Sequence, residues 1–299
     1  MAKSKWRAAD LPDQSGRTVI VTGASGGIGL VTARELARAG ARVVLAVRDV
    51  ARGSAAAASI AGRTEVRRLD VSDLGSVRSF VDQWTGEVDV LVNNAGVMDI
   101  PLSRTAEGFD LLTATNYLGP FVLTNLLLPR ITDRVVHVGS QLHRMGHARP
   151  DDLNWQRRPY RRQGAYSDSK LDLMLFSLEL QRRLTEAGST VRSLVAHPGI
   201  ATTNLVSHSP ANRVNRFRIL LNDPEHGALP TLFAATQDLP GNSYVGPDGP
   251  GGIKGYPRTG TPSRAARDGG TAARLWAATE TLIGTAARPA TPSRDPLSH

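Results

Sequence analysis

The amino-acid sequence predicts an α/β protein whose single sheet is parallel, doubly wound and covered by helices on both faces. Two observations lead to this prediction. Six short runs of aliphatic and β-branched residues alternate along the chain with segments of helical periodicity, and parallel strands need such crossover segments. In addition, residues 17–29 combine a buried strand, a glycine turn and a helix start, after which the other elements follow in order.

The predicted strands comprise residues 18–22, 41–47, 65–69, 88–92, 134–139 and 191–196. The run at residues 18–22 is apolar and β-branched, which suits a strand covered on both faces in a parallel sheet. The predicted helices comprise residues 30–37, 51–60, 73–84, 107–128, 166–185, 224–237 and 262–282, and Ser72 or Asp73 caps the third of them. The segment around Tyr244, Val245 and Gly246 is rich in glycine and proline and is assigned no regular element.

Length and composition favour one domain. The 299 residues can bury a single large core, and no shift in composition marks an internal boundary. We predict an N-terminal arm at residues 1–14, one globular domain at 15–287 and a disordered tail at 288–299, where proline, serine and threonine are frequent.

The composition also excludes several classes of chemistry. The chain has no cysteine, so it forms neither disulfides nor thiolate sites, which is consistent with a cytoplasmic location. Its net charge of +9 comes almost wholly from scattered arginines, and we expect no nucleic-acid partner. The N-terminus lacks the apolar core of a signal peptide, and the longest apolar run, residues 121–128, is too short to span a bilayer. A soluble protein without membrane contact is expected.

Gly23, Gly27 and Gly29 stand between the first strand and the first helix. Glycines there let the chain turn tightly and let a pyrophosphate approach bare N–H groups at the positive end of a helix dipole. Their spacing, G-x-x-x-G-x-G, differs from the G-x-G-x-x-G of many dinucleotide-binding proteins, so the agreement is one of mechanism. The turn predicts a nucleotide site, and the alternative is a glycine-rich turn that binds nothing.

Tyr166 and Lys170 lie four residues apart at the start of a predicted helix, so both side chains project from one face. A phenol with a pKa near ~10 is a poor acid or base at neutral pH, but an adjacent ammonium stabilises the phenolate and lowers that pKa. The pair predicts an acid/base catalyst, and the alternative is an ordinary amphipathic helix. Ser140 closes the fifth strand, where its hydroxyl either bonds a substrate carbonyl or merely caps a turn.

Asn116 lies inside the long helix predicted at residues 107–128, shortly before Gly119 and Pro120. These two residues should kink the helix. A kink frees a backbone carbonyl for a water molecule, and the alternative is a kink that serves packing only.

In this order the motifs resemble those of the short-chain dehydrogenase/reductase superfamily over nearly the whole chain. The matching segments are Thr22-Gly23-Ala24-Ser25-Gly26-Gly27-Ile28-Gly29, Asp70-Val71, Asn93-Asn94-Ala95-Gly96, Asn116, Ser140, Tyr166-x-x-x-Lys170 and Pro198-Gly199. The resemblance implies a Rossmann-type fold in which residues 15–287 bind a dinucleotide and carry out catalysis. The irregular loops 141–164 and 200–223 would then form the substrate pocket.

The resemblance also implies a role for each matching residue. Tyr166 would be the general acid/base, and Lys170 would lower its pKa and hold the ribose. Ser140 would orient the carbonyl, and Asn116 would position a water that relays protons. The implied cofactor contacts are Gly23, Ser25, Gly27, Ile28, Gly29, Ala95, Gly96, Pro198 and Gly199, with Asp70 and Val71 at the adenine, Asn93 in the cofactor channel, and Ile200 and Thr202 at the carboxamide.

Finer features are similar to the retinol-dehydrogenase-like branch of that superfamily. They are Ala46-Val47-Arg48-Asp49, Ser140-x-x-His143-Arg144, Asp151-Asp152-Leu153-Asn154 and Leu275-Trp276. Gly139 departs from the pattern, which usually has a second serine there, but Ser140 keeps the catalytic place. The N-terminal membrane segment of some members is missing, which favours a soluble bacterial-type enzyme.

The end of the second strand bears on the choice of cofactor. An acidic residue there would bind the ribose 2′-OH of NAD, whereas an arginine can pair with the 2′-phosphate of NADP. Arg48 comes first and Asp49 second, so we expect NADP rather than NAD.

Two other groups of side chains bear on metal binding and on substrate charge. His143 and His147 have a spacing that can bind zinc on a helix, but Gly146 disfavours a helix and no third ligand is apparent, so no metal is predicted. The second group is an arginine cluster formed by Arg157, Arg158, Arg161 and Arg162. The arginine cluster would attract anionic substrates if its loop borders the site, and the alternative is a solvated loop.

The sequence therefore predicts reversible hydride transfer between NADP(H) and a lipophilic carbonyl/alcohol pair. The alternative is a catalytically silent, NADP-binding regulatory or scaffold protein on the same fold. Members of the superfamily often assemble through two long helices, so a homodimer or homotetramer is expected unless the extended segment before Tyr166 covers that surface.

Overall fold

The computed structural model describes residues 5–199 and 223–284. Within them, eight strands form one sheet in the order β3-β2-β1-β4-β5-β6-β7-β8. All neighbouring pairs are parallel except β7 and β8, which are antiparallel. The strands are β1 (Thr18–Thr22), β2 (Arg42–Val47), β3 (Arg63–Arg68), β4 (Val88–Asn93), β5 (Ile131–Val138), β6 (Arg192–Ala196), β7 (Tyr244–Pro247) and β8 (Pro257–Gly260). The doubly wound sheet predicted from the sequence is confirmed.

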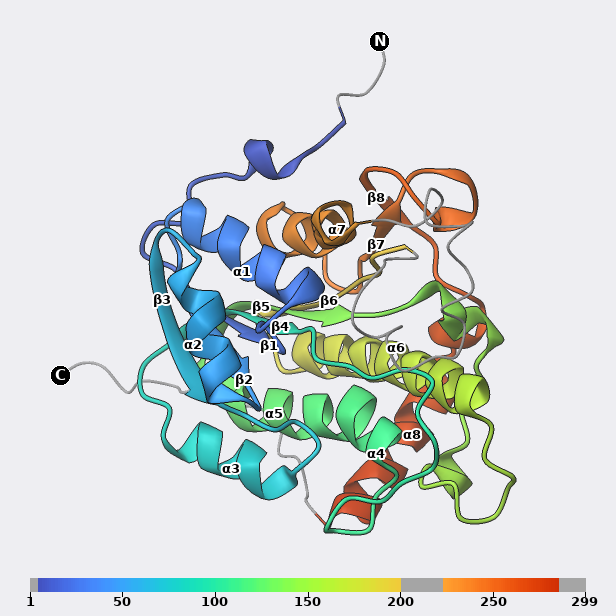
Figure 1. Cartoon of the computed structure of the whole chain (residues 1–299). Helices are drawn as coiled ribbons and strands as arrows, with labels where there is room; N and C mark the ends of the chain where they lie inside the picture. Colours follow the sequence, from blue (N-terminus) through green and yellow to red (C-terminus); the bar gives the residue numbers. More distant parts are fainter. Residues whose placement is uncertain (1–4, 200–222, 285–299) are drawn as a thin grey trace, which may run out of the picture.

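Helices cover both faces of the sheet (Figure 1). The main helices are α1 (Gly27–Arg38), α2 (Val50–Ala58), α3 (Leu74–Asp82), α4 (Leu111–Thr113), α5 (Gly119–Leu127), α6 (Arg162–Glu186), α7 (Pro224–Thr236) and α8 (Gly269–Ile283). One core lies beneath α1, α2 and α7 and the other beneath α3, α5, α6 and α8. Asp73 is the N-cap of α3, because its side chain accepts a hydrogen bond from the Ser76 N–H.

The prediction of one long, regular helix at residues 107–128 is wrong. Residues 105–108 form a turn, Asp110 caps α4, and a π-helical turn, η2 (Ala114–Leu118), joins α4 to α5. Gly119 has no side chain here because a Cβ would lie 1.8 Å from the carbonyl oxygen of Val71. The continuous helical segment Leu111–Arg130 is long and apolar enough to cross a membrane, yet 89% of that window is buried inside the fold.

The strands β7 and β8 were not predicted from the sequence. Strand β7 ends at Pro247 and the edge strand β8 begins at Pro257, and the two prolines lie opposite each other at the end of the ladder, where proline is tolerated. The segment 141–164 is also less irregular than expected, since it contains the short 3-10 helices η4 (Gln141–Met145) and η5 (Pro150–Asp152) and the first residues of α6. Helix α8 begins later than predicted, after the 3-10 turn η9 (Ala265–Arg267).

Candidate active site

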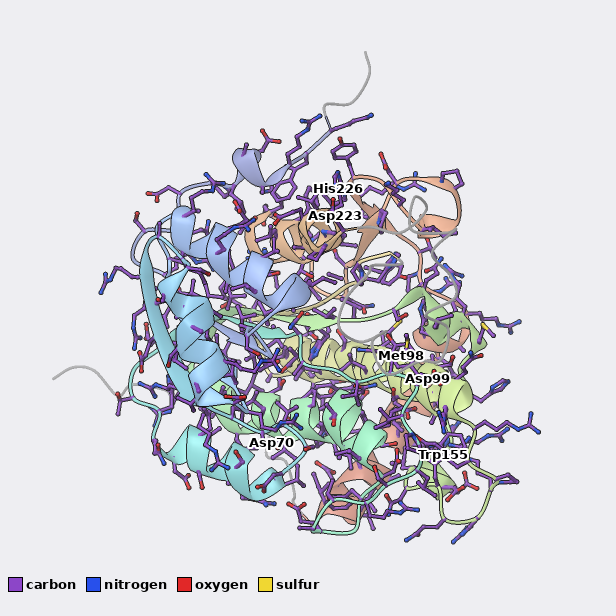
Figure 2. The ribbon with its side chains drawn as sticks, in the orientation of Figure 1. Asp70, Met98, Asp99, Trp155, Asp223 and His226 are labelled. Carbon is purple, nitrogen blue, oxygen red and sulfur yellow. The ribbon has the colours of Figure 1, made fainter. Side chains whose placement is uncertain are left out.

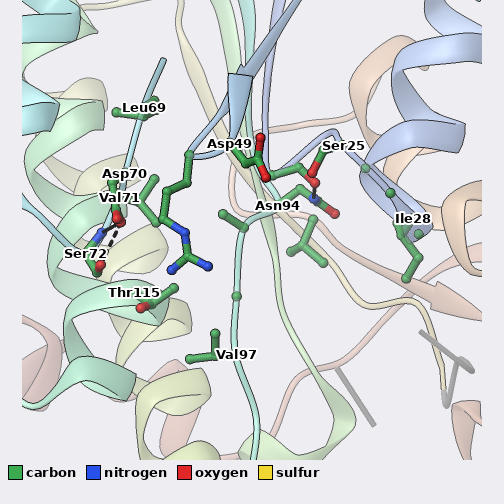
Figure 3. A pocket seen from close by; sticks show the side chains of 18 of the residues that line it. Ser25, Ile28, Asp49, Leu69, Asp70, Val71, Ser72, Asn94, Val97 and Thr115 are labelled. Carbon is green, nitrogen blue, oxygen red and sulfur yellow. Dashed lines mark hydrogen bonds between the residues drawn. The ribbon is translucent and has the colours of Figure 1, made fainter. Parts of the chain in front are cut away.

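A cavity of about 320 Å³ opens at the carboxyl ends of the parallel strands. Figure 3 shows Ser25 and Ile28 on one side of it and Asp70, Val71 and Ser72 on the opposite side. The residues that line it are Gly23, Ser25, Gly26, Gly27, Ile28, Gly29, Arg48, Asp49, Arg52, Leu69, Asp70, Val71, Ser72, Asn94, Ala95, Gly96, Val97, Leu111, Thr115, Val138, Gly139, Tyr166, Lys170 and Pro198. Thirteen of the predicted site residues are among them.

The glycine turn after β1 brings the first turn of α1 to the cavity. A Cβ on Gly29 would lie 2.4 Å from the Asn94 amide nitrogen and 2.8 Å from the Gly23 carbonyl oxygen. Only glycine therefore lets α1 pack this closely against the ends of β1 and β4. The helix begins at Gly27 without a side-chain cap, so no side chain caps its first N–H groups, which can bind an anion in the cavity.

The ends of β1 and β4 are joined by hydrogen bonds between Thr22 and the residues after Asn93. The Thr22 hydroxyl accepts from the backbone N–H groups of Asn94 (3.0 Å) and Ala95 (2.9 Å), and the Asn94 amide donates to the Thr22 carbonyl (2.8 Å). Asn94 thus lines the cavity. Asn93 does not, contrary to the prediction, because its side chain points into the core and donates to Thr124 (2.9 Å).

The far end of the cavity is bordered by two arginines, Arg48 and Arg52. Both side chains are exposed, and neither guanidinium is paired with any residue that the structure describes. Asp49, which lies between them, is the N-cap of α2 and accepts a hydrogen bond from the Arg52 N–H (3.0 Å). The only carboxylate at the end of β2 is therefore turned toward a helix terminus, while two cations face the cavity.

Asp70 and Val71 follow β3 and line the same end of the cavity. The Asp70 carboxylate accepts from the Ser72 N–H (3.0 Å) and hydroxyl (2.6 Å), which fixes the turn after the strand. These placements agree with the predicted contacts to an adenine ring.

Tyr166 and Ser140 meet at the end of β5. Tyr166 lies on the first turns of α6, its ring is buried, and the nearby Ser140 side chain lowers the pKa of its hydroxyl. The Ser140 hydroxyl also accepts from the Leu142 N–H (3.2 Å). The two predicted catalytic hydroxyls are thus adjacent, although only Tyr166 lines the cavity.

Lys170 lies one helical turn after Tyr166 and is also buried. Its ammonium donates to the Val138 carbonyl (2.9 Å) and lies 5.8 Å from the centre of the Tyr166 ring. Burial lowers the pKa of Lys170 to about 8. Burial also raises the pKa of Tyr166, and this outweighs the lowering by Ser140. The net shift of the Tyr166 pKa is therefore upward, opposite to the lowering by Lys170 that the sequence predicts.

Asn116 lies in the π-helical turn η2 and is fully buried. Its side chain donates to the Val97 carbonyl (2.9 Å) and the Ser169 hydroxyl (3.0 Å), and it accepts from the Val97 N–H (2.8 Å). A Cβ on Gly96 would lie 3.2 Å from the Asn116 amide oxygen and 3.6 Å from the Lys170 ammonium. Asn116 and Lys170 therefore both lie next to Gly96, which lines the cavity.

The remaining cofactor contacts fall at the end of β6. Pro198 lines the cavity, and Gly199 follows it with a φ of +73°. Ile200, Thr202 and the loop up to residue 222 lie outside the described residues.

The arginine cluster does not border the cavity. Arg158 is paired with Asp168 (2.7 Å) and Asp152 (3.4 Å), and its guanidinium stacks on the Trp155 ring at 3.5 Å. The other three arginines of the cluster are exposed. These placements favour the solvated loop over the steering of anionic substrates.

The two histidines considered for zinc are separated by their surroundings. His143 is buried in η4 with both ring nitrogens hydrogen bonded, whereas the His147 side chain is exposed. Among the described residues, no group of three or more metal-ligating side chains comes together.

An apolar wall stands beside Tyr166. It is formed by Leu112, Trp155, Ala165 and Tyr166, with Val97, Met98, Ile100 and Tyr160 packed against them. Figure 2 shows Met98 and Asp99 on the loop after β4, on the same side of the molecule as Trp155. Arg104 holds the carbonyl of Trp155 (3.1 Å), which keeps this residue in the left-handed region at a φ of +52°. Of the residues of this wall, only Val97 and Tyr166 line the cavity.

Several lining residues were missed in the sequence. Arg52 is one, and its signal was the predicted start of α2, because a cap at Asp49 places Arg52 on the first turn beside Arg48. Thr115 and Leu111 are others, and they had no local signal because only the bend of η2 turns them toward the cavity.

Comparison with known proteins shows where such a site occurs. The family described as short chain dehydrogenase matches residues 17–151. Human retinol dehydrogenase 13 is 41% identical over 293 residues, which cover 90% of this chain and 85% of the relative. Mouse polyprenol dehydrogenase is 40% identical over 253 residues, covering 78% of this chain and 75% of the relative.

Solved structures agree with these relatives. A crystal structure of an uncharacterized protein from Mycobacterium paratuberculosis is 51% identical, with a TM-score of 0.85, over 95% of this chain and 100% of that one. A structure described as an NAD(P)-dependent gluconate 5-dehydrogenase from Beutenbergia cavernae, with bound NADP, is 26% identical over 75% of this chain and 91% of that one, with a TM-score of 0.59.

Proposed function

Because the chain belongs to the short-chain dehydrogenase/reductase family, on its retinol-dehydrogenase-like branch, we propose that it transfers hydride reversibly between NADP(H) and a carbonyl/alcohol pair. The observation that carries this proposal is the meeting of Ser140, Tyr166 and Lys170 at the wall of the cavity that begins at the glycine turn. The nicotinamide, when bound, supplies or accepts the hydride.

The protein's own residues supply orientation and a proton. In the direction of reduction, the hydroxyls of Ser140 and Tyr166 polarise the substrate carbonyl, and Tyr166 donates the proton to the developing alkoxide. Lys170, charged below a pKa of about 8, lies close enough to Tyr166 to stabilise the phenolate that remains. Asn116 holds the loop after β4 against α6 through Val97 and Ser169.

The cavity fits a dinucleotide that carries a 2′-phosphate. The first turn of α1 presents uncapped N–H groups, which suit a pyrophosphate. Two unpaired guanidiniums, Arg48 and Arg52, lie at the end of the cavity where a 2′-phosphate would bind. Asp49, the residue that could select NAD, already caps α2. We therefore favour NADP over NAD.

Val97, Leu111 and Tyr166 give the cavity an apolar side, which supports a lipophilic alcohol, aldehyde or ketone as the substrate. The cytoplasmic location and the homo-oligomer expected from the sequence stay predictions.

The decisive test is a Tyr166→Phe variant. It removes the proton donor and little else, so turnover should be abolished over a panel of aldehydes, ketones, sterols and retinoids, while NADPH affinity stays within about twofold. NADPH consumption and fluorescence titration measure the two quantities. Near-normal turnover in the variant would refute the mechanism. A wild-type protein that binds NADPH but turns over nothing in the panel would instead favour the regulatory or scaffold alternative.

A further inference from the structure

The side chain of His143 is fully buried behind Ser140, outside the cavity lining, and both of its ring nitrogens have partners. Nδ1 lies 2.7 Å from the Ser140 carbonyl oxygen, and Nε2 lies 3.2 Å from the backbone nitrogen of Ser263. Because a backbone N–H can only donate, Nε2 must accept. Nδ1 then carries the ring proton and donates it to Ser140. The two contacts thus require one neutral tautomer.

Aromatic neighbours hold the His143 ring in place. Its edge packs on Tyr244 of β7, with ring centres 5.7 Å apart, and Tyr244 stacks in turn on His197 at 5.1 Å. The Tyr244 hydroxyl donates to the Gln141 amide oxygen (3.0 Å), and the Gln141 amide donates to the Gly251 carbonyl (2.8 Å). His143 therefore has a fixed position between β7 and Ser140.

Ser140 itself has few other anchors. Strand β5 ends at Val138, so Ser140 lies beyond the sheet ladder. Its carbonyl accepts only from the backbone and the ring of His143 among the described residues, and its hydroxyl accepts from the Leu142 N–H. The ring of His143 is thus the only described side chain that bonds the backbone of Ser140.

We propose that His143 is a positioning residue for Ser140, which it connects through Ser263 to the segment that leads into α8. This inference rests on the proposed function, since it gives His143 a role only if Ser140 orients a substrate. His143 reaches the reacting atoms through Ser140 alone. A displacement of a catalytic hydroxyl by about 1 Å can lower a rate by ~100-fold, so we expect loss of the ring contact to lower kcat.

Two conservative variants distinguish the hydrogen bond at Nδ1 from the hydrogen bond at Nε2. In His143→Asn the amide nitrogen replaces Nδ1 and can still donate to the Ser140 carbonyl. In His143→Gln the amide reaches the place of Nε2 and leaves the Ser140 carbonyl without its side-chain donor. His143→Leu removes both contacts. The matched control is His147→Asn, because His147 lies on the same segment with an exposed side chain.

The expected result is a loss of kcat of at least about tenfold for His143→Leu and His143→Gln, with Kd for NADPH within about twofold of the wild type. His143→Asn should retain kcat to within about threefold, and His147→Asn should match the wild type. If His143→Leu fails to fold, the comparison of the Asn and Gln variants decides the matter. Unchanged kcat in His143→Gln, or an equal loss in the Asn and Gln variants, would overturn the positioning role while wild-type turnover still upheld the proposed function. No wild-type turnover would overturn both.

Discussion

Arg48 and Asp49 link β2 to α2, and Arg52 lies on the first turn of α2, but the three side chains have different roles. Asp49 accepts the hydrogen bond that caps α2. The two arginines have no partner among the described residues and line the cavity. Under the proposed preference for NADP, two guanidiniums and not one would contact the 2′-phosphate.

We predict that Arg48→Ala and Arg52→Ala each weaken NADP binding by about tenfold or more. A charge-assisted contact to a phosphate contributes roughly 1.5–3 kcal/mol, and each variant removes one. NAD binding should hardly change. Calorimetric titration with both cofactors measures the difference. Arg63→Ala is the matched control, because this exposed arginine begins β3 at the end opposite the cavity. Equal binding of NAD and NADP by the wild type would show that the phosphate assignment is wrong.

At the scale of elements, the π-helical turn η2 decides how α5 meets the loop after β3. Gly119 begins α5 directly after this turn and touches the Val71 carbonyl, so Val71 and Asn116 are placed by the same contact region. The predicted kink at Gly119 and Pro120 is therefore present in the form of a widened helical turn. Its consequence is that one packing contact serves both the adenine end and the catalytic end of the cavity.

A Gly119→Ala substitution tests this coupling between elements. The added Cβ would lie 1.8 Å from a backbone oxygen, so α5 or the loop after β3 must shift. We expect a loss of about 1–3 kcal/mol of unfolding free energy and weaker NADP binding. Denaturant unfolding and cofactor titration give the two values. Gly269→Ala, at the start of α8, adds the same methyl group with no atom within 4 Å and should change neither. A wild-type response to NADP in the Gly119 variant would contradict the coupling.

At the scale of the whole molecule, α8 covers the surface through which related proteins were expected to assemble. Trp276 packs against Phe121 of α5 and Phe176 of α6, with ring centres 4.8 and 5.6 Å away, and Thr279 is hydrogen bonded to Tyr117 (2.6 Å). Within the described residues, the surfaces of α5 and α6 are thus partly covered by α8 of the same chain. The homo-oligomer predicted from the sequence would need another surface or a displaced α8.

The buried histidines make the stability of the whole domain depend on pH. Burial and the nearby Lys170 lower the pKa of His137 to about 3, and burial, His143 and Arg144 lower the pKa of His197 to about 4. An unfolded histidine has a pKa near ~6.5. As the pH falls below that value, the unfolded chain takes up protons that the folded protein does not, so the folded state loses stability.

We therefore expect the unfolding free energy to fall between pH 6.5 and about 4, by up to about 1.4 kcal/mol per pH unit for each of these histidines. Urea unfolding at a series of pH values measures the slope. His137→Leu should flatten it, while His147→Gln, at an exposed position, should leave it unchanged. A slope that is the same in the His137 variant as in the wild type would show that this residue protonates equally in both states.

The sequence alone determined the sheet, the glycine turn and the spacing of Tyr166 and Lys170, because strands, helices and helix faces are set by short periodic patterns. Tertiary structure decided which neighbour of a pair faces the cavity, as with Asn94 rather than Asn93, and which charges are free. Arg158 forms ion pairs with two aspartates, whereas Arg48 forms none with the described residues, although both are arginines in polar segments. These outcomes depend on contacts between residues far apart in the chain, such as His143 with Ser263, and no local pattern encodes such contacts.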